Sequence, residues 1–319
     1  MRDKEKHHSV LDGIQRRFLS GDIDKYQYSR DLHSNHMGLF DYARWLEKTG
    51  IKEIKIGKNE VSLLTDDGLL FPLDTEDQYL PPTQLLNFGD YERPERDLLF
   101  RIVKPGMTVF DIGANIGWYS LLIAQKMPQC KLLAFEPIPS TCRRLSRNVE
   151  LNRLSNITVY NHGLSDSEEE KIFYFAPEIS GAASGANILG WDTVRTEKCR
   201  VRRMDDVWRE NALRVDFIKC DVEGAELFVF RGGAECLASD KPVIFCEMLR
   251  KWSAKFSYHP NQIVDMLKEL GYSCHAVGSV GIKKMTKMDE STEETNFIFF
   301  HDISHACIKE NLAADGLLL

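Results

Sequence analysis

Two kinds of hydrophobic pattern alternate along the chain after the turn Lys104-Pro105-Gly106. One kind is a short, mostly apolar run, typical of a buried strand, and it occurs in MTVFDI, KLLAFE, ITVYN, VDFIKCD and PVIFCEM. The other kind has apolar residues at helical spacing and occurs in WYSLLIAQKM, STCRRLSRNVELN and AELFVFRG. Since strands that alternate with helices pair in parallel, this pattern predicts an α/β fold with a parallel sheet covered by helices on both faces.

A predicted helix over Ile263 to Leu270 precedes two further strands. These strands span Tyr272 to Val277 and Asn296 to Phe300, and a charged loop rich in Lys, Met and Glu joins them. The two strands are expected to form a terminal antiparallel pair. The segment after His301 is too weakly patterned for an assignment.

The N-terminal part of the chain has a different pattern. From Val10 to about Lys48 apolar residues recur at helical spacing, with Gly21 as a break. Between Ile51 and Leu73, the alternating segment IKEIKI and the turn TDDG predict a small β-hairpin. We therefore expect three regions. Residues 1–82 form a helical arm and a β-hairpin, which serve in dimerisation or as a lid. Residues 83–303 form the main α/β domain, and residues 304–319 form a tail.

Composition narrows the classes of protein. The 319 residues include 41 Lys and Arg against 48 Asp and Glu, and because the basic residues are dispersed, nucleic acid is not expected as a partner. No apolar run approaches the length of about 18 residues that a membrane-spanning helix needs, and no secretory signal is recognised. The eight cysteines form no CxxC pair, so we expect core thiols and a cytoplasmic protein.

The strongest chemical signal lies where the first strand of the main domain ends. Asp111 closes that strand, and Gly113 and Gly117 frame a turn that leads into a helix. Glycines let the backbone approach a ligand closely, and the free N–H groups of a helix start face the crevice beyond the strand. This pattern favours a nucleotide-like ligand, and a tight turn without any ligand is the alternative.

Glu136 supplies a second signal, at the end of the next strand. A carboxylate there can accept hydrogen bonds from both hydroxyls of a ribose. An NAD site would need GxGxxG to hold a pyrophosphate, whereas this turn reads Gly-Ala-Asn-Ile-Gly and follows an acid. Asp111 is badly placed for a pyrophosphate and well placed for an ammonium or sulfonium group. The sequence therefore predicts S-adenosylmethionine as the cofactor.

A third signal is the acidic turn in DFIKCDVEGAE. Lys219 and Asp221 project from the same side of a strand end, and Glu223 follows them. These residues are catalytic candidates, although acids at a solvated helix start would also explain the pattern. Glu247 ends the next strand, where it is a base partner, an oxygen ligand of a divalent metal or a structural residue.

Taken in order, the motifs DIGANIG, FEPIPSTCRRLSRNVELN, NHGLSD, DFIKCDVEGAE and RGGAECL resemble the FkbM family of S-adenosylmethionine-dependent methyltransferases. The resemblance covers roughly residues 86 to 300 and includes the lead-in PGMTVFDIGAN. It implies the seven-stranded, doubly wound methyltransferase sheet, which has six parallel strands and an antiparallel seventh. It also implies methylation of hydroxyl groups on natural products and sugars.

The resemblance also assigns the cofactor-binding residues. It places Glu136 at the ribose, Gly163 and Leu164 beside the adenine, and Glu92 in a segment that covers the cofactor. In the loop, Asn115 takes the place of a middle glycine, as it does in the FkbM pattern, and its side chain is expected to contact the cofactor. The implied loop residues are Asp111, Gly113, Asn115 and Gly117.

The sequence thus predicts an O-methyltransferase that acts on a sugar, glycan or natural product by in-line methyl transfer. We expect Asp221 or Glu223 to orient or deprotonate the acceptor hydroxyl, with Lys219 tuning the local charge, and a divalent metal and a homo-oligomer stay open. A non-catalytic scaffold of a glycan-building complex is the alternative, and a dehydrogenase is disfavoured. Two further features have two interpretations each. Trp191, Trp208 and Trp252 either stack on a sugar or aromatic acceptor or are packing residues. The segment Ser180 to Asn187 is either a mobile loop at the acceptor or a flexible linker.

Overall fold

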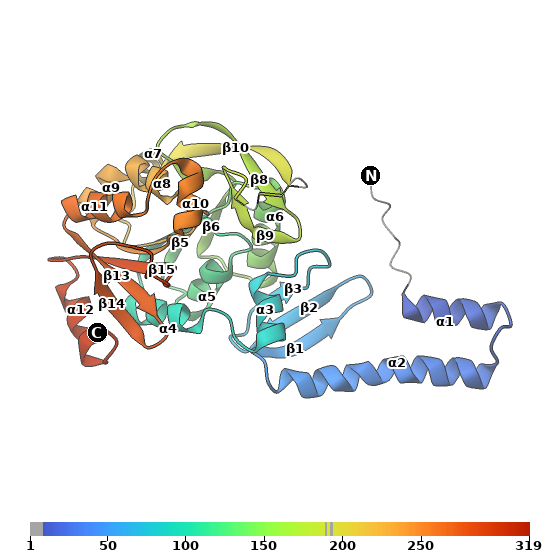
Figure 1. Ribbon diagram of the computed structural model, residues 1–319. Coiled ribbons are helices and arrows are strands. Elements are labelled where there is room, and N and C mark those ends of the chain that lie inside the picture. The colour runs from blue at the N-terminus through green and yellow to red at the C-terminus, as the bar shows by residue number, and fades with distance from the viewer. Residues whose placement is uncertain (1–8, 189, 192–193) are drawn as a thin grey trace.

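Eight strands form the central sheet of the protein, in the order β14-β13-β15-β12-β11-β4-β5-β6. The computed structural model describes residues 9–188, 190–191 and 194–319. Figure 1 shows this sheet inside the body of the molecule and a helical arm that projects to one side. The strands are β4 (Thr108–Ile112), β5 (Lys131–Phe135), β6 (Ile157–Tyr160), β11 (Phe217–Cys220), β12 (Val243–Glu247), β13 (Tyr272–Gly278), β14 (Gly281–Met285) and β15 (Asn296–His301).

The strand directions confirm the expected methyltransferase sheet. β4, β5, β6, β11 and β12 are parallel, and β15 is antiparallel to both β12 and β13, so six strands run one way and the seventh runs against them. β14 is an eighth strand, in the segment that sequence analysis expects to be a charged loop. Its sequence, GIKKM, is short and lysine-rich, as is common at the open edge of a sheet, and such a strand leaves no clear apolar pattern.

Helices cover both faces of the sheet, as predicted. Successive strand residues point to opposite faces, so Val109 belongs to one hydrophobic core and Phe110 to the other. The first core includes residues of α4 (Arg93–Ile102), α5 (Trp118–Lys126) and α6 (Pro139–Leu151), and the second includes residues of α7 (Met204–Asn211), α8 (Glu226–Gly232), α9 (Ala234–Asp240) and α11 (Asn261–Glu269). Shorter elements are α10 (Arg250–Ser253) and η1 (Ala254–Phe256), while α12 (Ala306–Ala314) lies in the tail that the sequence leaves unassigned.

The N-terminal part consists of two helices and a small sheet. The helices are α1 (Val10–Leu19) and α2 (Lys25–Leu46), and Asp24 caps α2 by accepting a 2.7 Å hydrogen bond from the Gln27 N–H. The predicted hairpin has a third strand, so that β1 (Ile51–Ile56), β2 (Val61–Thr65) and β3 (Leu70–Pro72) form an antiparallel sheet. Pro81 and Pro82 begin α3 (Pro81–Phe88). The boundary near residue 82 stays a prediction.

A second sheet, absent from the sequence-based expectations, lies at the top of the body in Figure 1. Its order is β7-β10-β8-β9, formed by β7 (Gly163–Ser165), β10 (Arg195–Arg203), β8 (Glu169–Ala176) and β9 (Ile179–Ser184). β9 occupies most of the segment expected to be a loop or linker. Its one glycine and two alanines have low strand propensity, and its pairing with β8 makes it a strand.

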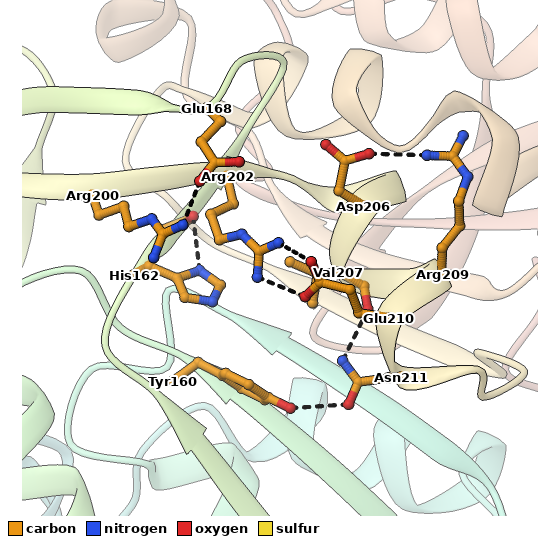
Figure 2. A network of polar contacts seen from close by, with 11 residues as sticks. Tyr160, His162, Glu168, Arg200, Arg202, Asp206, Val207, Arg209, Glu210 and Asn211 are labelled. Carbon is orange, nitrogen blue, oxygen red and sulfur yellow. Dashed lines mark hydrogen bonds and ion pairs between the residues drawn. The ribbon is translucent and has the colours of Figure 1, made fainter.

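Polar contacts fasten the second sheet to the central one, as Figure 2 shows. Arg202 of β10 makes a two-pronged ion pair with Glu210 of α7. The Tyr160 hydroxyl of β6 donates a 2.9 Å hydrogen bond to Asn211, which in turn donates to the Val207 carbonyl. β10 is therefore tied through α7 to the edge strand of the central sheet.

The cysteines follow the expectation of core thiols in seven positions of eight. Cys307, on α12, is exposed, and the others are buried and free. In the described part of the chain, no helix combines the length and the apolar character needed to cross a lipid bilayer.

Candidate active site

The carboxyl ends of four neighbouring strands bring the predicted site residues to one edge of the sheet. Asp111 lies one residue before the end of β4, beside Lys219 of β11 in direct register. Glu136 follows β5 on one side, and Glu247 ends β12 on the other. Because these strands are adjacent and parallel, side chains far apart in the sequence meet there.

The loop after β4 is held so tightly that glycine is required at position 113. Gly113 has φ +78°, and a Cβ placed there would lie 1.8 Å from the carbonyl oxygen of Asp221. The N–H groups of Gly113 and Ala114 both donate to the Phe135 carbonyl, at 3.0 Å. Asn115 also has a positive φ, 49°, which asparagine tolerates better than most residues. The loop thus packs directly on the acidic turn after β11.

Glu136 lies beneath this loop. Its carboxylate accepts hydrogen bonds from the N–H of Asn115 at 3.0 Å and the N–H of Ile138 at 2.9 Å. Burial raises the pKa of Glu136 to about 7, against the opposing effect of these two donors. Each oxygen keeps a lone pair for a further donor, as contacts with two ribose hydroxyls would need.

Asp111 is almost fully buried and incompletely satisfied. Its Oδ2 accepts a 2.6 Å hydrogen bond from the Ser120 hydroxyl, while Oδ1 accepts none from any described residue. Burial raises the pKa of Asp111, and the Lys219 ammonium opposes that shift. A buried carboxylate oxygen without a partner is costly, and a cationic ligand group would satisfy it.

Lys219 is the cation of the site. Its Nζ donates to Asp221 Oδ2 at 3.1 Å and lies 5.4 Å from the ring centroid of Tyr119. Burial alone lowers the pKa of Lys219, but the carboxylates of Asp221 and Asp111 outweigh it and the pKa is raised. Lys219 is therefore charged, which fixes the orientation of Asp221.

Glu92 reaches the same cluster from the start of α4. Its Oε2 accepts a 2.5 Å hydrogen bond from the Tyr119 hydroxyl, and burial raises its pKa. Glu92 has φ 46°, a conformation that turns the chain into α4. The role of Glu92 in covering the cofactor stays a proposal.

Three carboxylates gather at the acidic turn. One oxygen from each of Asp221, Glu223 and Glu247 lies within 4.8 Å of the others. Asp221 Oδ1 and Glu223 Oε2 are buried and find no hydrogen-bond donor within the described residues. Burial first, and then the charge of Asp221, raise the pKa of both Glu223 and Glu247. The turn therefore holds more carboxyl groups than the single ammonium of Lys219 can keep ionised, and Glu223 and Glu247 keep a proton to higher pH than ordinary glutamates.

Two residues that the sequence does not single out hold this turn. Glu226 accepts a 2.9 Å hydrogen bond from the Gly224 N–H, and the Tyr258 hydroxyl lies 3.1 Å from Glu226 Oε2 and 2.9 Å from the Gly224 carbonyl oxygen. Glu226 was visible as the last acid of the motif, but Tyr258 comes from the loop before α11 and leaves no local signal.

β9 makes hydrogen bonds to both the loop after β4 and the turn after β11. The Ser180 hydroxyl donates to Asn115 Oδ1 at 3.3 Å, and the Ser184 hydroxyl donates to the Glu223 carbonyl at 2.8 Å. At its other edge the Ser180 N–H donates to Asp77, at 2.9 Å. The segment expected to be an acceptor loop or linker is thus a strand in contact with both halves of the site.

The remaining candidates lie further out. A Cβ at Gly163 would be 3.5 Å from Pro137, so Gly163 and Leu164 flank the segment after Glu136. Trp208 packs beside the second core and donates to Asp240 at 2.7 Å, which supports its interpretation as a packing residue. Trp191 is 41% exposed, and the backbone of Trp252 abuts Gly224.

The sheet with an antiparallel seventh strand, the glycine loop and the acid below it together define a cofactor-binding α/β domain of the methyltransferase type. Residues 111–274 match the model of the methyltransferase FkbM domain. The chain belongs to the FkbM methyltransferase family.

Relatives of this chain include methyltransferases from fungi, bacteria and archaea. It is 35% identical to methyltransferase sdnD of Sordaria araneosa over an alignment of 153 residues. This alignment covers 39% of this chain and 59% of that protein. It is 27% identical to the 2-O-methyltransferase NoeI of Sinorhizobium fredii, over 46% of this chain and 65% of that protein. It is 28% identical to the hexuronic acid methyltransferase AglP of Haloferax volcanii, over 48% of this chain and 62% of that protein. The alignments span 10% to 65% of the curated relatives' lengths.

Proposed function

We propose that the protein transfers a methyl group from S-adenosylmethionine to a hydroxyl of a sugar, glycan or natural product. The observation that carries the proposal is the buried excess of carboxylates around Lys219, with an unsatisfied Asp111 oxygen next to the tight loop at Gly113. Such a site is built for a cation, and when bound, S-adenosylmethionine supplies a methyl group on a positively charged sulfonium that leaves readily. In this assignment Asp111 binds the cationic end, Glu136 the ribose hydroxyls, and Gly163 and Leu164 flank the adenine.

The acceptor side of the site is assigned to the acidic turn. A hydroxyl loses its proton as its oxygen is alkylated, so a base within hydrogen-bond reach is needed. Asp221 fits this role because Lys219 holds one of its oxygens and the other is free for the acceptor. Glu223 and Glu247, whose pKa values are raised, hold a proton near neutral pH and orient the acceptor as hydrogen-bond donors, while Asp221 receives the proton of the hydroxyl.

The same three carboxylates offer a second way to activate the hydroxyl. Oxygen ligands within 4.8 Å of one another suit a divalent cation such as Mg²⁺, which would lower the pKa of a bound hydroxyl.

The acceptor class rests on the relatives, one of which is named a 2-O-methyltransferase and another a hexuronic acid methyltransferase. The buried free thiols favour a reducing compartment such as the cytoplasm.

The first test is calorimetric titration with S-adenosylmethionine, S-adenosylhomocysteine and NAD, followed by transfer of labelled methyl groups to a panel of sugars and hydroxylated natural products. We expect binding of the first two ligands only, and transfer to a hydroxyl. Transfer that is lost with a chelator and restored by Mg²⁺ would assign the acid trio to a metal. Absence of both binding and transfer would contradict the proposal and favour a scaffold.

Asp221→Asn separates the acceptor side from the cofactor side. We expect normal binding of S-adenosylhomocysteine and a loss of turnover of about 100-fold or more, because general base catalysis contributes roughly that much. Asp12→Asn, an exposed change of the same type on α1, is the matched control and should keep full activity. Full turnover of Asp221→Asn would remove Asp221 from the mechanism.

A further inference from the structure

The helical arm carries an apolar stripe that is covered at both ends and open in the middle. Along α2, six residues follow one another at intervals of 4, 3, 4, 3 and 4, which is the spacing of a coiled-coil seam: Tyr28, Leu32, Asn35, Leu39, Tyr42 and Leu46. We refer to these residues as the α2 seam. All of them except Asn35 are apolar or aromatic.

Each end of the α2 seam has a partner within the chain. At the first end, Tyr28 stacks on Phe18 of α1, with ring centroids 4.4 Å apart. At the other end, Leu46 packs against the first core, and its neighbour Trp45 donates a 2.7 Å hydrogen bond to the Leu86 carbonyl. α1 runs back along only the first half of α2, as Figure 1 shows, so the middle of the seam lies between α1 and the body.

The middle of the seam is exposed to solvent. Leu39 is 54% exposed and Tyr42 is 53% exposed, and no residue of the 22 in α2 is buried by the part of the chain that the structure describes. A helix of this length with Gly38 in its interior gains little stability from propensity alone and normally needs a packed face. The exposed middle of α2 therefore lacks the partner that its pattern and length call for.

We propose that the partner is a second copy of this chain, whose α2 seam lies against the first in a two-fold symmetric dimer. Two identical seams are complementary because each presents the same apolar residues to the other. Asn35 is polar, as single seam positions are in coiled coils that fix their register. Its Nδ2 already donates to the Asp31 carbonyl at 2.9 Å, which leaves its side-chain oxygen for the partner.

The charges on the exposed half of α2 favour a second copy over other partners. On the exposed half of α2 the formal charges are Asp41 and Arg44, which pair with each other, so this face attracts neither an anionic membrane nor a basic protein. Of the large exposed side chains there, Leu39 and Tyr42 belong to the seam and Trp45 borders it, whereas Met37 and Phe40 lie on the other side of the helix. The apolar surface that a partner can cover in this half of α2 is therefore that of the seam.

The test is the mass of the full chain in solution, by sedimentation and light scattering over a range of micromolar concentrations. We expect the wild type to have twice the 36.6 kDa of the monomer and the double variant Leu39→Glu/Tyr42→Glu to be monomeric. Tyr26→Glu is the matched control, because Tyr26 is 81% exposed on the same helix but outside the seam, and it should stay dimeric. Circular dichroism shows whether each variant keeps its helices.

A second variant changes association in the opposite direction. Asn35→Leu removes the polar position of the seam, so we expect a dimerisation constant at least ten-fold tighter than that of the wild type. A monomeric wild type at all concentrations would overturn the proposal, and so would a dimer that survives both seam glutamates.

Discussion

Single side chains at the sheet edge determine what the site can bind. Asp111 and Glu136 are buried, and Asp221, Glu223 and Glu247 are half-buried. Loss of solvent together with mutual repulsion raises the pKa values of Glu136, Glu223 and Glu247. One buried lysine cannot keep all of these carboxyls ionised. Each carboxylate that pairs with a cationic ligand therefore increases the affinity for that ligand. Substitution of one residue at a time measures the contribution of each carboxylate.

Asp111→Asn is expected to weaken binding of S-adenosylmethionine about 10- to 100-fold, because a charge-assisted contact contributes about 1.5–3 kcal/mol. Folding should not suffer, since the carboxylate has an oxygen without a donor among the described residues. Calorimetric titration and a melting curve measure the two effects. Ser120→Ala, which leaves the Asp111 charge in place, should weaken binding less, and equal losses would argue against a direct role of that charge.

Binding of the cofactor should also release protons at neutral pH. Glu136 has a pKa of about 7 without ligand, and a cation bound nearby lowers the pKa values of the raised carboxyls, so that protonated fractions ionise. The binding enthalpy should therefore vary with the ionisation enthalpy of the buffer near pH 7, in the sense of proton release. Identical enthalpies in phosphate and Tris would contradict this expectation.

At the scale of elements, the contact between two loops decides the geometry of the site. The loop after β4 and the turn after β11 meet through Gly113 and the Asp221 carbonyl, with no room for a methyl group. The turn is held in place by Glu226 and Tyr258, and β9 spans both parts. A small displacement of either loop thus moves the cofactor and acceptor sides relative to each other.

Gly113→Ala should destabilise the protein by about 2–4 kcal/mol, because it adds overpacking to the cost of a left-handed backbone. Gly106→Ala is the matched control, since Gly106 has φ +90° but nothing within 4 Å of an added Cβ. That control should cost only about 1 kcal/mol, from the backbone alone. Denaturant unfolding of the two variants separates the terms, and equal losses would mean that the loops can move apart.

The sequence predicted the central sheet because its strands are continuous apolar runs between helical segments. It also predicted Asp111, Lys219 and Glu247 at one edge, since parallel strands end together. β7, β9 and β10 escaped prediction because their sequences are short, polar or rich in small residues, and pairing makes them strands. β8 contains the apolar run IFYFA, which is a strand signal within a polar stretch. Ser120 and Tyr258 escaped it because their roles depend on which way a helix face or a distant loop packs.

At the scale of the whole molecule, stability depends on ionisable groups buried away from the site. His275 is 2% exposed in β13, next to Phe300, and burial lowers its pKa to about 4. His305 is also buried, and its pKa is lowered to about 4. Both histidines are neutral in the folded protein, whereas in the unfolded chain they take up protons near pH 6.5.

Since the folded pKa lies below the unfolded value, His275 costs stability as the pH falls from about 6.5 toward 4. Relative to His275→Phe, the wild type should lose about 2 kcal/mol between pH 7 and pH 5. Denaturant unfolding of both proteins at several pH values measures this difference. Glu136 and Glu226, whose pKa values are raised to about 7, act in the opposite sense in both proteins and cancel in the comparison. A difference independent of pH would contradict the assignment.

Seven of the eight thiols are buried, and Cys307 on α12 is exposed. Because burial raises the pKa of thiols such as Cys199 and Cys246, they form little thiolate and react slowly with alkylating reagents. A maleimide dye should therefore attach at one position of the folded chain, without mutagenesis. Cys307 therefore offers a site for attaching a fluorescent dye or for immobilising the native protein on a surface, outside the sheet edge where the acids meet.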